Sequence, residues 1–527
     1  MVEKLVPLPQ RVNGTEGAAL RLGSRWCVAV PSEGSRALGE TVAGLLERLH
    51  GVATFVRVGG GGDLNLMLAQ LGADPRADPG ADPGAVGAAR GIDPLDEPDG
   101  LTREAYALTV TQTAATVTAP TAEGLFRGAT TFAQLIGTDR AVAPVEVADG
   151  PAWAWRGLSL DVARRFFTVA EVKRVVDLLA LYKFNVLHLH LTDSQGWRLE
   201  MESRPRLTDG DFYTQDDYRE IVAYAAARFV TVVPEIDMPG HTHSVVRAYP
   251  ALRGETVPPH ELVAFLDPRA EDAPRFVADV LGELAALTPG PYLHIGGDEA
   301  FGMPREPYAE FVAMSLEAGR ATGKKVVAWQ EAARSGGLRP DDVAQCWIGE
   351  ADPFDAEALR ERAAPEYHAL IDLAAEAFEE SAGDVPAAVA GGVPVLASPK
   401  GLLYLDRRYA EDSLLPDQTA RRAKVGHRDY EPRTSRELFA WSPGTLTDIP
   451  ADARVAGVEA AVWCETVKGF DDLAFLLLPR LPAIAEKAWT RGETAWEDYR
   501  GRVAPHAHWW ERLGWNGYYR SSEVFGR

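Results

Sequence analysis

Two adjacent carboxylates follow a short apolar run near the middle of this chain. The stretch YLHIGGDE (292–299) resembles a buried strand that ends in two glycines and then in Asp298 and Glu299. Barrel enzymes keep their chemistry at the C-terminal ends of parallel strands, and glycines would let both acids turn toward one ligand. Two acids in different roles suit general acid–base catalysis. A helix capped by Asp298, with Glu299 in its first turn, also fits this stretch, which by itself leaves both interpretations open.

Eight apolar runs alternate with helical segments in the chain that follows residue 150. The strands are expected over 157–162, 185–191, 229–236, 292–295, 325–329, 344–348, 393–397 and 455–463. Amphipathic helices are expected over 169–182, 215–228, 274–287 and 307–322. This alternation predicts a (β/α)8 TIM barrel as the catalytic domain, over 151–527 with C-terminal helices.

Residues 1–150 have the pattern of a separate, smaller α+β domain. Short strand-like runs lie at 26–30, 52–58, 64–68, 106–111 and 115–118, and helical stretches lie at 35–49 and 122–136. The Pro- and Gly-rich stretch 72–100 predicts a long surface loop. No chemistry is expected from this domain.

Polar and aromatic residues collect at the predicted strand ends, which all lie on one rim of a barrel. These are Asp161, Arg164, His188, His190, Asp193, Glu235, Asp237, His241, His243, Asp298, Glu299, Trp329, Gln330, Glu331, Trp347, Tyr404, Asp406, Trp463 and Glu465. With Trp441 added, four tryptophans supply flat walls that suit the apolar face of a sugar ring. Arg164, Asp406 and Glu465 suit its hydroxyl groups. An acid pair inside such walls indicates glycoside hydrolysis.

Two other classes compete with this interpretation. His188-x-His190 and His241-x-His243 have the ligand types of a metal-dependent barrel hydrolase, although further ligands at metal-site spacing are missing. A catalytically inactive carbohydrate-binding protein would keep the tryptophans but would not need adjacent carboxylates.

The composition limits partners and compartment. The 527 residues carry 54 Lys and Arg against 76 Asp and Glu, a net charge of −22 that argues against nucleic acid and anionic membranes as partners. Three scattered cysteines are too few for a disulfide framework. Without an apolar leader or a membrane-length run, the expected location is cytoplasmic, unless the true start lies upstream and encodes a signal.

Six motifs in order resemble the β-N-acetylhexosaminidases, family 20 glycoside hydrolases. They are WRGLSLDVARRFF (155–167), HLHLTDSQGWR (188–198), VVPEIDMPGH (232–241), HIGGDE (294–299), AWQE (328–331) and GVEAAVWCET (457–466). LVPLPQ near the start and the run EAYALTV through GLFRGATTFAQL (104–135) are similar to the non-catalytic N-terminal domain of that family.

The resemblance implies a retaining, substrate-assisted mechanism, in which the substrate's 2-acetamido oxygen attacks the anomeric carbon and forms an oxazolinium intermediate. It implies that Glu299 is the general acid and base, and that Asp298 orients the acetamide. A neighbouring carboxylate charge is expected to raise the pKa of Glu299. Because the substrate supplies the nucleophile, the resemblance implies no metal or organic cofactor.

The resemblance also assigns the remaining site residues. Tyr404 would hold the acetamide carbonyl, and Asp193 with His241 would tune the acid. Trp329, Trp347 and Trp441 would enclose the acetamido methyl group, Trp463 would stack under the ring, and Arg164, Asp406 and Glu465 would bind outer hydroxyls.

Several features leave the exact substrate open. Ser194 and Cys464 depart from the residue types usual in the family. The charged segment 407–438 is longer than the family's connection; a lid, an interface and a solvated loop are the interpretations, with the solvated loop as the default. The preferred sugar, N-acetylglucosamine or N-acetylgalactosamine, and the oligomeric state stay open. Release of a disaccharide, which some members of the family perform, is the alternative to release of a single terminal sugar.

Overall fold

The fold was analysed in a computed structural model that describes residues 4–69, 103–253, 263–349, 354–442, 446 and 449–526. The loop expected over 72–100 lies outside the described residues. None of the helices among those residues is long and apolar enough to cross a membrane.

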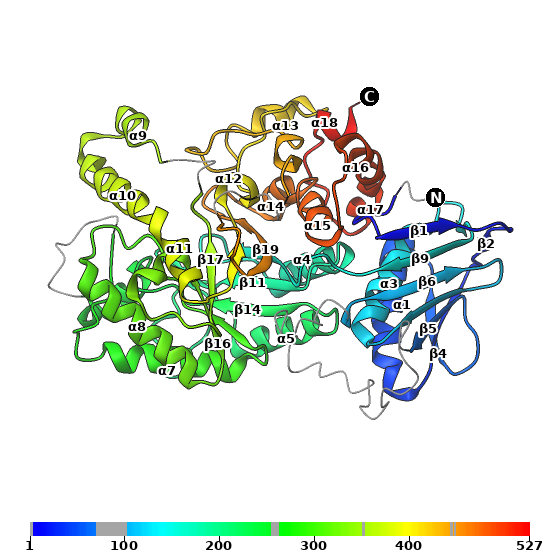
Figure 1. The fold of residues 1–527 in the computed structure, drawn as a ribbon, viewed down its shortest axis with the longest axis horizontal. Helices are drawn as coiled ribbons and strands as arrows, with labels where there is room; N and C mark the ends of the chain where they lie inside the picture. The colour runs from blue at the N-terminus through cyan, green and yellow to red at the C-terminus, as the bar shows by residue number, and fades with distance from the viewer. Residues whose placement is uncertain are drawn as a thin grey trace.

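In the described part of the N-terminal region, a seven-stranded mixed sheet is packed with the helices α1 (Arg36–His50) and α3 (Ala122–Leu135) (Figure 1). Its spatial order is β1 (Arg11–Gly14), β9 (Val145–Asp149), β6 (Tyr106–Val110), β7 (Ala115–Ala119), β5 (Leu64–Leu68), β3 (Trp26–Val30) and β4 (Thr54–Val58). Both helices pack on this sheet, and β2 (Leu20–Arg21) pairs with β8 (Ala141–Val142). The predicted α+β architecture is therefore confirmed.

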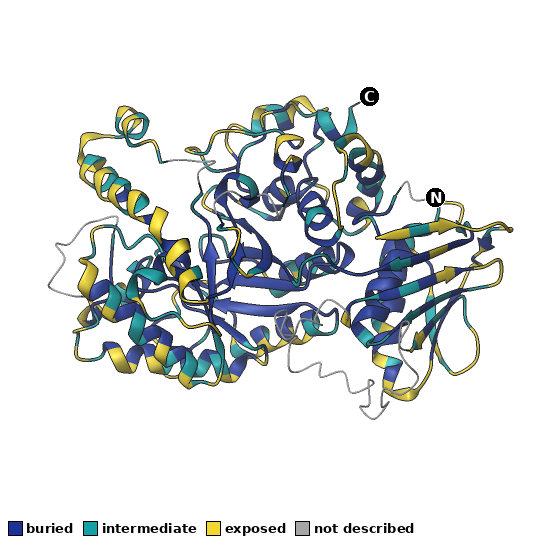
Figure 2. Ribbon diagram, viewed as in Figure 1, coloured by how far each residue is buried: buried dark blue, intermediate teal, exposed yellow. Residues whose placement is uncertain are grey.

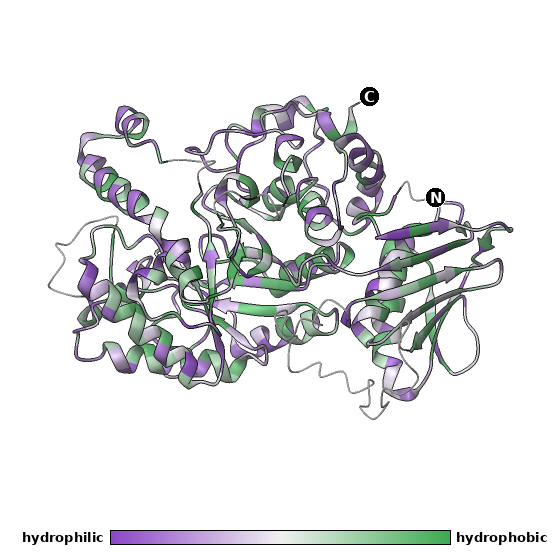
Figure 3. Ribbon diagram, viewed as in Figure 1, coloured by the Kyte–Doolittle hydropathy of each residue, from purple (hydrophilic) through white to green (hydrophobic). Residues whose placement is uncertain are grey.

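Eight parallel strands close into the predicted barrel. They are β10 (Trp155–Asp161), β11 (Val186–His190), β14 (Thr231–Glu235), β15 (Tyr292–His294), β16 (Lys325–Trp329), β17 (Val343–Cys346), β18 (Val395–Ala397) and β19 (Val455–Val462). Each coincides with an expected strand, and the strands are almost entirely buried (Figure 2). They read as near-continuous apolar runs because both faces of such a strand are covered (Figure 3).

Helices follow the strands around the barrel. They are α4 (Val169–Leu181), α5 (Gln215–Ala226), α6 (His243–Ala248), α7 (Ala273–Leu287), α8 (Arg305–Ala321), α9 (Ala356–Arg362), α10 (His368–Glu380), α11 (Asp384–Ala390) and α12 (Lys400–Leu403). Thr168 and Glu171 form a capping box at the start of α4, which satisfies two otherwise unpaired backbone N–H groups. The helices α9 and α10 project from the barrel, and the outer side of α10 is exposed (Figures 1 and 2).

The interior of the barrel is apolar at its base and polar above it. One buried apolar residue from each strand fills the base: Trp155, Val186, Val233, Tyr292, Val327, Val343, Leu396 and Ala456. Side chains two positions further along β11 share the same face, so His188 and then His190 point into the barrel above Val186. This alternation carries polar groups up the barrel toward its C-terminal rim.

A buried ion pair joins the N-terminal sheet to the barrel. Lys183, which precedes β11, lies 3.0 Å through Nζ from Asp149 at the end of β9. The Asp149 carboxylate also accepts from the Trp489 indole at 3.0 Å and from the Tyr106 hydroxyl at 2.6 Å. The division of the chain after residue 150 stays a prediction, and these contacts lie directly beside it.

The remaining helices cover one side of the barrel (Figure 1). They are α13 (Pro416–Arg421), α14 (Phe470–Leu477), α15 (Leu481–Trp489), α16 (Trp496–Val503), α17 (Ala507–Arg512) and α18 (Ser522–Phe525). The segment 407–438, by default a solvated loop, instead packs against them: Tyr409 stacks on Tyr519 at 4.0 Å between ring centroids, and Gln418 donates to the Tyr518 carbonyl at 2.8 Å. The solvated-loop interpretation was wrong for the buried Tyr409 and Gln418, whose contacts a charge pattern does not report, whereas Leu414 and Leu415 are exposed.

Candidate active site

The loop after β15 brings the two adjacent acids to the barrel rim. Gly296 and Gly297 have φ values of +72° and +107°, and a Cβ atom on Gly296 would lie 1.7 Å from Asp237 Oδ1. The expected bend at these glycines is confirmed, and it lets the backbone pass Asp237, whose Oδ1 accepts from the Gly297 N–H at 3.1 Å. No helix begins at Asp298, because α8 starts at Arg305, so the helix-cap interpretation was wrong.

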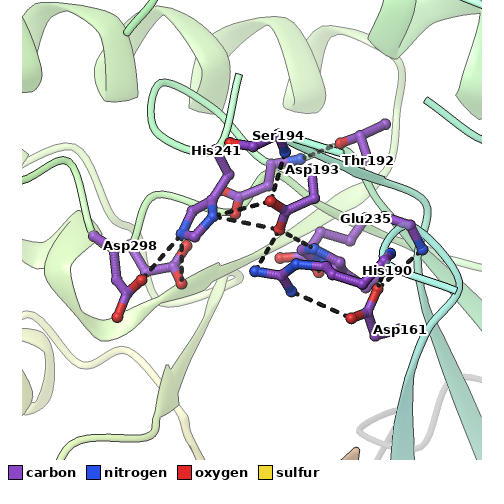
Figure 4. Close-up of polar contacts among 12 residues, drawn as sticks. Asp161, His190, Thr192, Asp193, Ser194, Glu235, His241 and Asp298 are labelled. Atoms are coloured by element: carbon purple, nitrogen blue, oxygen red, sulfur yellow. Dashed lines mark hydrogen bonds and ion pairs between the residues drawn. The ribbon is translucent and has the colours of Figure 1, made fainter. Parts of the chain in front are cut away.

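Asp193, His241 and Glu299 form a line of contacts, and Figure 4 shows His241 between Asp193 and Asp298. His241 Nδ1 lies 3.3 Å from the Asp193 carboxylate, and its Nε2 lies 3.4 Å from Glu299 Oε2. The same nitrogen is 3.8 Å from Asp298 Oδ2. The backbone φ angles of His241 and Glu299 are positive, at 56° and 48°, and residues other than glycine rarely adopt such values. Such backbone conformations cluster where a site imposes its geometry.

Arg164 joins this group from the end of β10. Its Nη2 lies 2.7 Å from Asp193 and 3.8 Å from Glu465, and its guanidinium stands 5.4 Å from the Trp463 ring centroid. Asp161 accepts from the Arg164 N–H at 2.9 Å and from the Cys464 N–H at 3.0 Å, so one carboxylate ties together the ends of β10 and β19.

The two adjacent acids have opposite electrostatic surroundings. Burial and the nearby Asp237 carboxylate raise the pKa of Asp298 well above its usual value. Burial also acts to raise the pKa of Glu299, but the contact with His241 and the positive charges of Arg164 and Lys400 outweigh it and lower that pKa. The expected upward shift at Glu299 was wrong, because the group that touches its carboxylate is an imidazole rather than Asp298.

Four aromatic side chains form walls beside the acids. Trp463 lies 6.1 Å from Trp329 and 5.7 Å from Tyr404 between ring centroids, and Tyr404 stacks parallel to Trp347 at 6.4 Å. The indole of Trp329 donates to Glu235 at 2.8 Å. These bonds and contacts hold the ring planes in fixed orientations.

The structure places Trp441 apart from these walls. It packs in the main apolar core and donates through its indole N–H to the Leu438 carbonyl at 3.0 Å. Two residues that the sequence analysis did not single out pack against the walls instead: Phe378 of α10 and Tyr430 of the segment 407–438. The Tyr430 ring lies 6.3 Å from that of Tyr404. The sequence could have indicated Tyr430 only through its residue type, because it is an aromatic residue within a charged segment.

Within the described ranges, two carboxylates carry oxygens without a well-aligned hydrogen-bond partner. Asp406 is 1% exposed, and among the described residues neither of its oxygens has a well-aligned hydrogen-bond partner. Asp298 Oδ1 is in the same situation. A buried polar atom without a partner is costly, so these oxygens are suited to donors that a ligand brings.

Three sets of side chains within the described residues have the donors for a metal ion. They are His188, Glu235 and His294; His190, Glu235 and Asp237; and Asp237, His241 and Asp298. In the first two sets, histidine nitrogens already face the Glu235 carboxylate, which forms a hydrogen bond with His190. His243 lies elsewhere, with its Nδ1 3.0 Å from the Ser194 hydroxyl, so the two His-x-His pairs do not meet at one point.

Comparison with known proteins agrees with this geometry. The profile of the glycosyl hydrolase family 20 catalytic domain matches residues 153–309 and 305–492, and that of domain 2 of the family matches residues 3–150. A β-N-acetylhexosaminidase from Cellulomonas fimi is 37% identical, with 97% of this chain and 95% of that protein aligned.

Solved structures of the family share the whole fold. A family 20 β-N-acetylhexosaminidase from Streptomyces coelicolor A3(2) superposes with a TM-score of 0.80 at 34% identity, over 99% of this chain and 98% of its own. A mutant β-hexosaminidase from Streptomyces plicatus, in complex with its product N-acetylglucosamine, gives a TM-score of 0.79 at 33% identity, over 99% and 98% of the two chains.

An acid pair on the rim of a (β/α)8 barrel, beside aromatic walls and unpaired carboxylate oxygens, defines a glycoside hydrolase. The family matches narrow this class. The chain belongs to glycosyl hydrolase family 20, and its enzymatic class is that of the β-N-acetylhexosaminidases.

Proposed function

We propose that this enzyme removes a terminal β-linked N-acetylglucosamine or N-acetylgalactosamine by a retaining, substrate-assisted mechanism. The observation that carries the proposal is the adjacency of Asp298 and Glu299, with His241 on Glu299 and an unpaired oxygen on Asp298. Two carboxylates on neighbouring residues lie at the same end of a bound substrate, so neither is placed to attack the anomeric carbon from the opposite face of the sugar ring. A nucleophile from the substrate itself therefore accounts for retention of the anomeric configuration.

In this mechanism Glu299 protonates the leaving oxygen and later takes a proton from water. Asp298 accepts a hydrogen bond from the acetamide N–H and stabilises the positive charge of the oxazolinium ring. Tyr404 holds the acetamide carbonyl, and Asp193 acts on Glu299 through His241.

The same scheme gives the pocket residues their roles. Trp329 and Trp347 enclose the acetamido methyl group, and Trp463 stacks under the sugar ring. Arg164, Asp406 and Glu465 bind the outer hydroxyls. Trp441 has no place in this scheme, because it lies in a different apolar cluster.

The opposite pKa shifts of the two acids imply which of them is protonated more readily. In the free enzyme the proton favours Asp298, whose pKa is raised, over Glu299, whose pKa is lowered. A bound acetamide N–H favours ionised Asp298, so in the complex the proton belongs on Glu299, where the acid step needs it.

The first test compares p-nitrophenyl N-acetyl-β-glucosaminide with the matching plain β-glucoside, in the presence of EDTA. Turnover of the acetamido substrate alone supports participation of the acetamide. Turnover that disappears with EDTA would instead support the metal-dependent alternative, and turnover of neither would direct the work to disaccharide aryl glycosides.

The second test concerns the acid. Glu299→Gln should lower hydrolysis of a free N-acetylglucosamine disaccharide by about 10²- to 10⁴-fold, the usual contribution of general acid catalysis. The loss should be smaller for the p-nitrophenyl glycoside, whose leaving group needs little protonation. Equal losses on both substrates would contradict the acid role.

A further inference from the structure

A line of alternating carboxylates and imidazoles runs through the barrel interior to the active site. We call it the buried His–carboxylate chain, and its members in order are Glu459, His188, Glu235, His190, Asp193 and His241, after which it meets Glu299. All but His241 are 2% exposed or less. Only Asp193 and His241 of this chain have a role in the proposed acid step so far.

The distances along this chain are short. His188 Nδ1 lies 2.8 Å from Glu459 and its Nε2 lies 3.2 Å from Glu235. His190 contacts Glu235 through Nδ1 and Asp193 through Nε2, the latter at 2.9 Å. Figure 4 shows His190 between Glu235 and Asp193.

His190 is hydrogen-bonded to a carboxylate at both nitrogens, whereas His188 is hydrogen-bonded to Glu459 through Nδ1 and only faces Glu235 through Nε2. A neutral imidazole has only one N–H, so it could donate to one carboxylate and would place a lone pair against the other. The doubly protonated form donates to both and carries the matching charge. His190 is therefore a charged bridge with a fixed ring plane, held between two anions.

We propose that His190, held by Glu235, is a positioning residue that sets the Asp193 carboxylate and thereby fixes His241 against Glu299. The inference rests on the proposed role of Glu299 as the acid. Asp193 Oδ2 accepts from both His190 and Arg164, which fixes its plane, and His241 is oriented by that carboxylate. Without His190, the carboxylate rotates toward Arg164 and the His241 Nε2 moves relative to Glu299.

Other charged groups face the same residues and constrain the experiment. Glu235 Oε1 also lies 3.0 Å from His294 Nδ1 and accepts from the Trp329 indole, and Asp193 is also faced by Arg164. The His190 ring meets Trp463 edge-on at 5.1 Å. A loss of packing at position 190 would thus disturb the sugar-binding wall and reduce hydrolysis of every substrate alike, whereas a loss of positioning would reduce the acid step selectively.

The test uses His190→Gln and Glu235→Gln in the full-length enzyme, with two substrates of different leaving groups. In the first variant the new amide can still donate to Asp193 but cannot bridge to Glu235. In the second variant the new amide keeps the shape of the glutamate side chain and removes its charge. We expect hydrolysis of the free disaccharide to fall by about 10²-fold, the scale of a misplacement of about 1 Å at a catalytic group. Hydrolysis of the p-nitrophenyl glycoside should fall several-fold less.

The control is His506→Gln, another fully buried histidine, which lies outside the barrel against the Lys4 carbonyl and Tyr182. It should lower the thermal midpoint without changing the ratio of the two activities. The thermal midpoint of each barrel variant shows how much of its loss is due to unfolding.

Equal losses on the two substrates for His190→Gln and Glu235→Gln, or no loss at all, would overturn the positioning role. The Glu299→Gln enzyme separates this failure from failure of the proposed function. If Glu299→Gln shows the split between leaving groups and the barrel variants do not, only the positioning role is wrong. If Glu299→Gln shows no split, the acid assignment itself is wrong.

Discussion

Replacement of Asp193 by Asn should move the pH profile of this enzyme in a defined direction. Burial alone would lower the pKa of His241, but the Asp193 carboxylate outweighs burial and raises that pKa well above its usual value. A neutral amide at position 193 removes the largest effect that opposes burial, so the pKa of His241 falls and less of it is charged at pH 7. Glu299 then loses the imidazolium that favours its ionised form, so its pKa rises and it stays protonated to a higher pH.

The size of the shift follows from the contact distance. Two unit charges 3.4 Å apart, the distance between His241 Nε2 and Glu299 Oε2, interact by about 5 kcal/mol at an effective dielectric constant of about 20. The Glu299 side chain is 33% exposed, so solvent screens the pair, and about 1 to 2 kcal/mol, or about one pKa unit, is a realistic expectation.

The assay is kcat/KM against pH for the p-nitrophenyl N-acetylglucosaminide. The alkaline limb of the Asp193→Asn profile should lie about one pH unit above that of the wild type, with a lower maximum because the acid is weaker and less well positioned. Glu465→Gln is the matched comparison: it also removes a carboxylate near Arg164 but does not touch His241, so KM should rise and the limb should stay in place. An Asp193→Asn limb that is unmoved, or moved to lower pH, would refute the reasoning.

Three further predictions concern the pocket and the fold. Trp463→Ala should raise KM by at least about tenfold through loss of the stacking face, while the same change at Trp441 should lower the thermal midpoint more than it affects KM. Lys183→Met should lower the free energy of unfolding in urea titrations by about 3 to 5 kcal/mol, because it leaves the Asp149 charge buried without its cation. Adding Asp149→Asn should recover part of the loss. A double variant whose loss equals the sum of the two single losses would contradict the ion pair. Burial lowers the pKa of His506 to about 3, so below about pH 6.5 the unfolded chain binds a proton that the folded chain does not. The free energy of unfolding therefore decreases as the pH falls, by up to about 1.4 kcal/mol per pH unit from this group. Urea titrations of His506→Gln between pH 4 and 7 should show a shallower dependence of that free energy on pH, and an unchanged dependence would exclude His506 as a cause.

The sequence by itself determined the architecture and the acid pair. The eight strands overlap the apolar runs of the sequence, because a strand that is buried on both faces is largely apolar along its length. Asp298 and Glu299 reach the rim because the two glycines before them adopt positive φ values, which glycine does without strain. Both inferences depend on residues that are adjacent in the sequence, namely a run of apolar residues and a pair of glycines.

The tertiary structure decided the electrostatics and the membership of the pocket. The pKa of Glu299 is lowered because His241, 58 positions earlier in the sequence, folds against it, and no local pattern reports that contact. Tyr430 and Phe378 join the aromatic walls, and Trp441 does not, because their places depend on how long insertions pack on the barrel. Glu459, a lone acid in an apolar strand, was visible in the sequence, but only the closed barrel brings its carboxylate within hydrogen-bond distance of His188, 271 positions away along the chain.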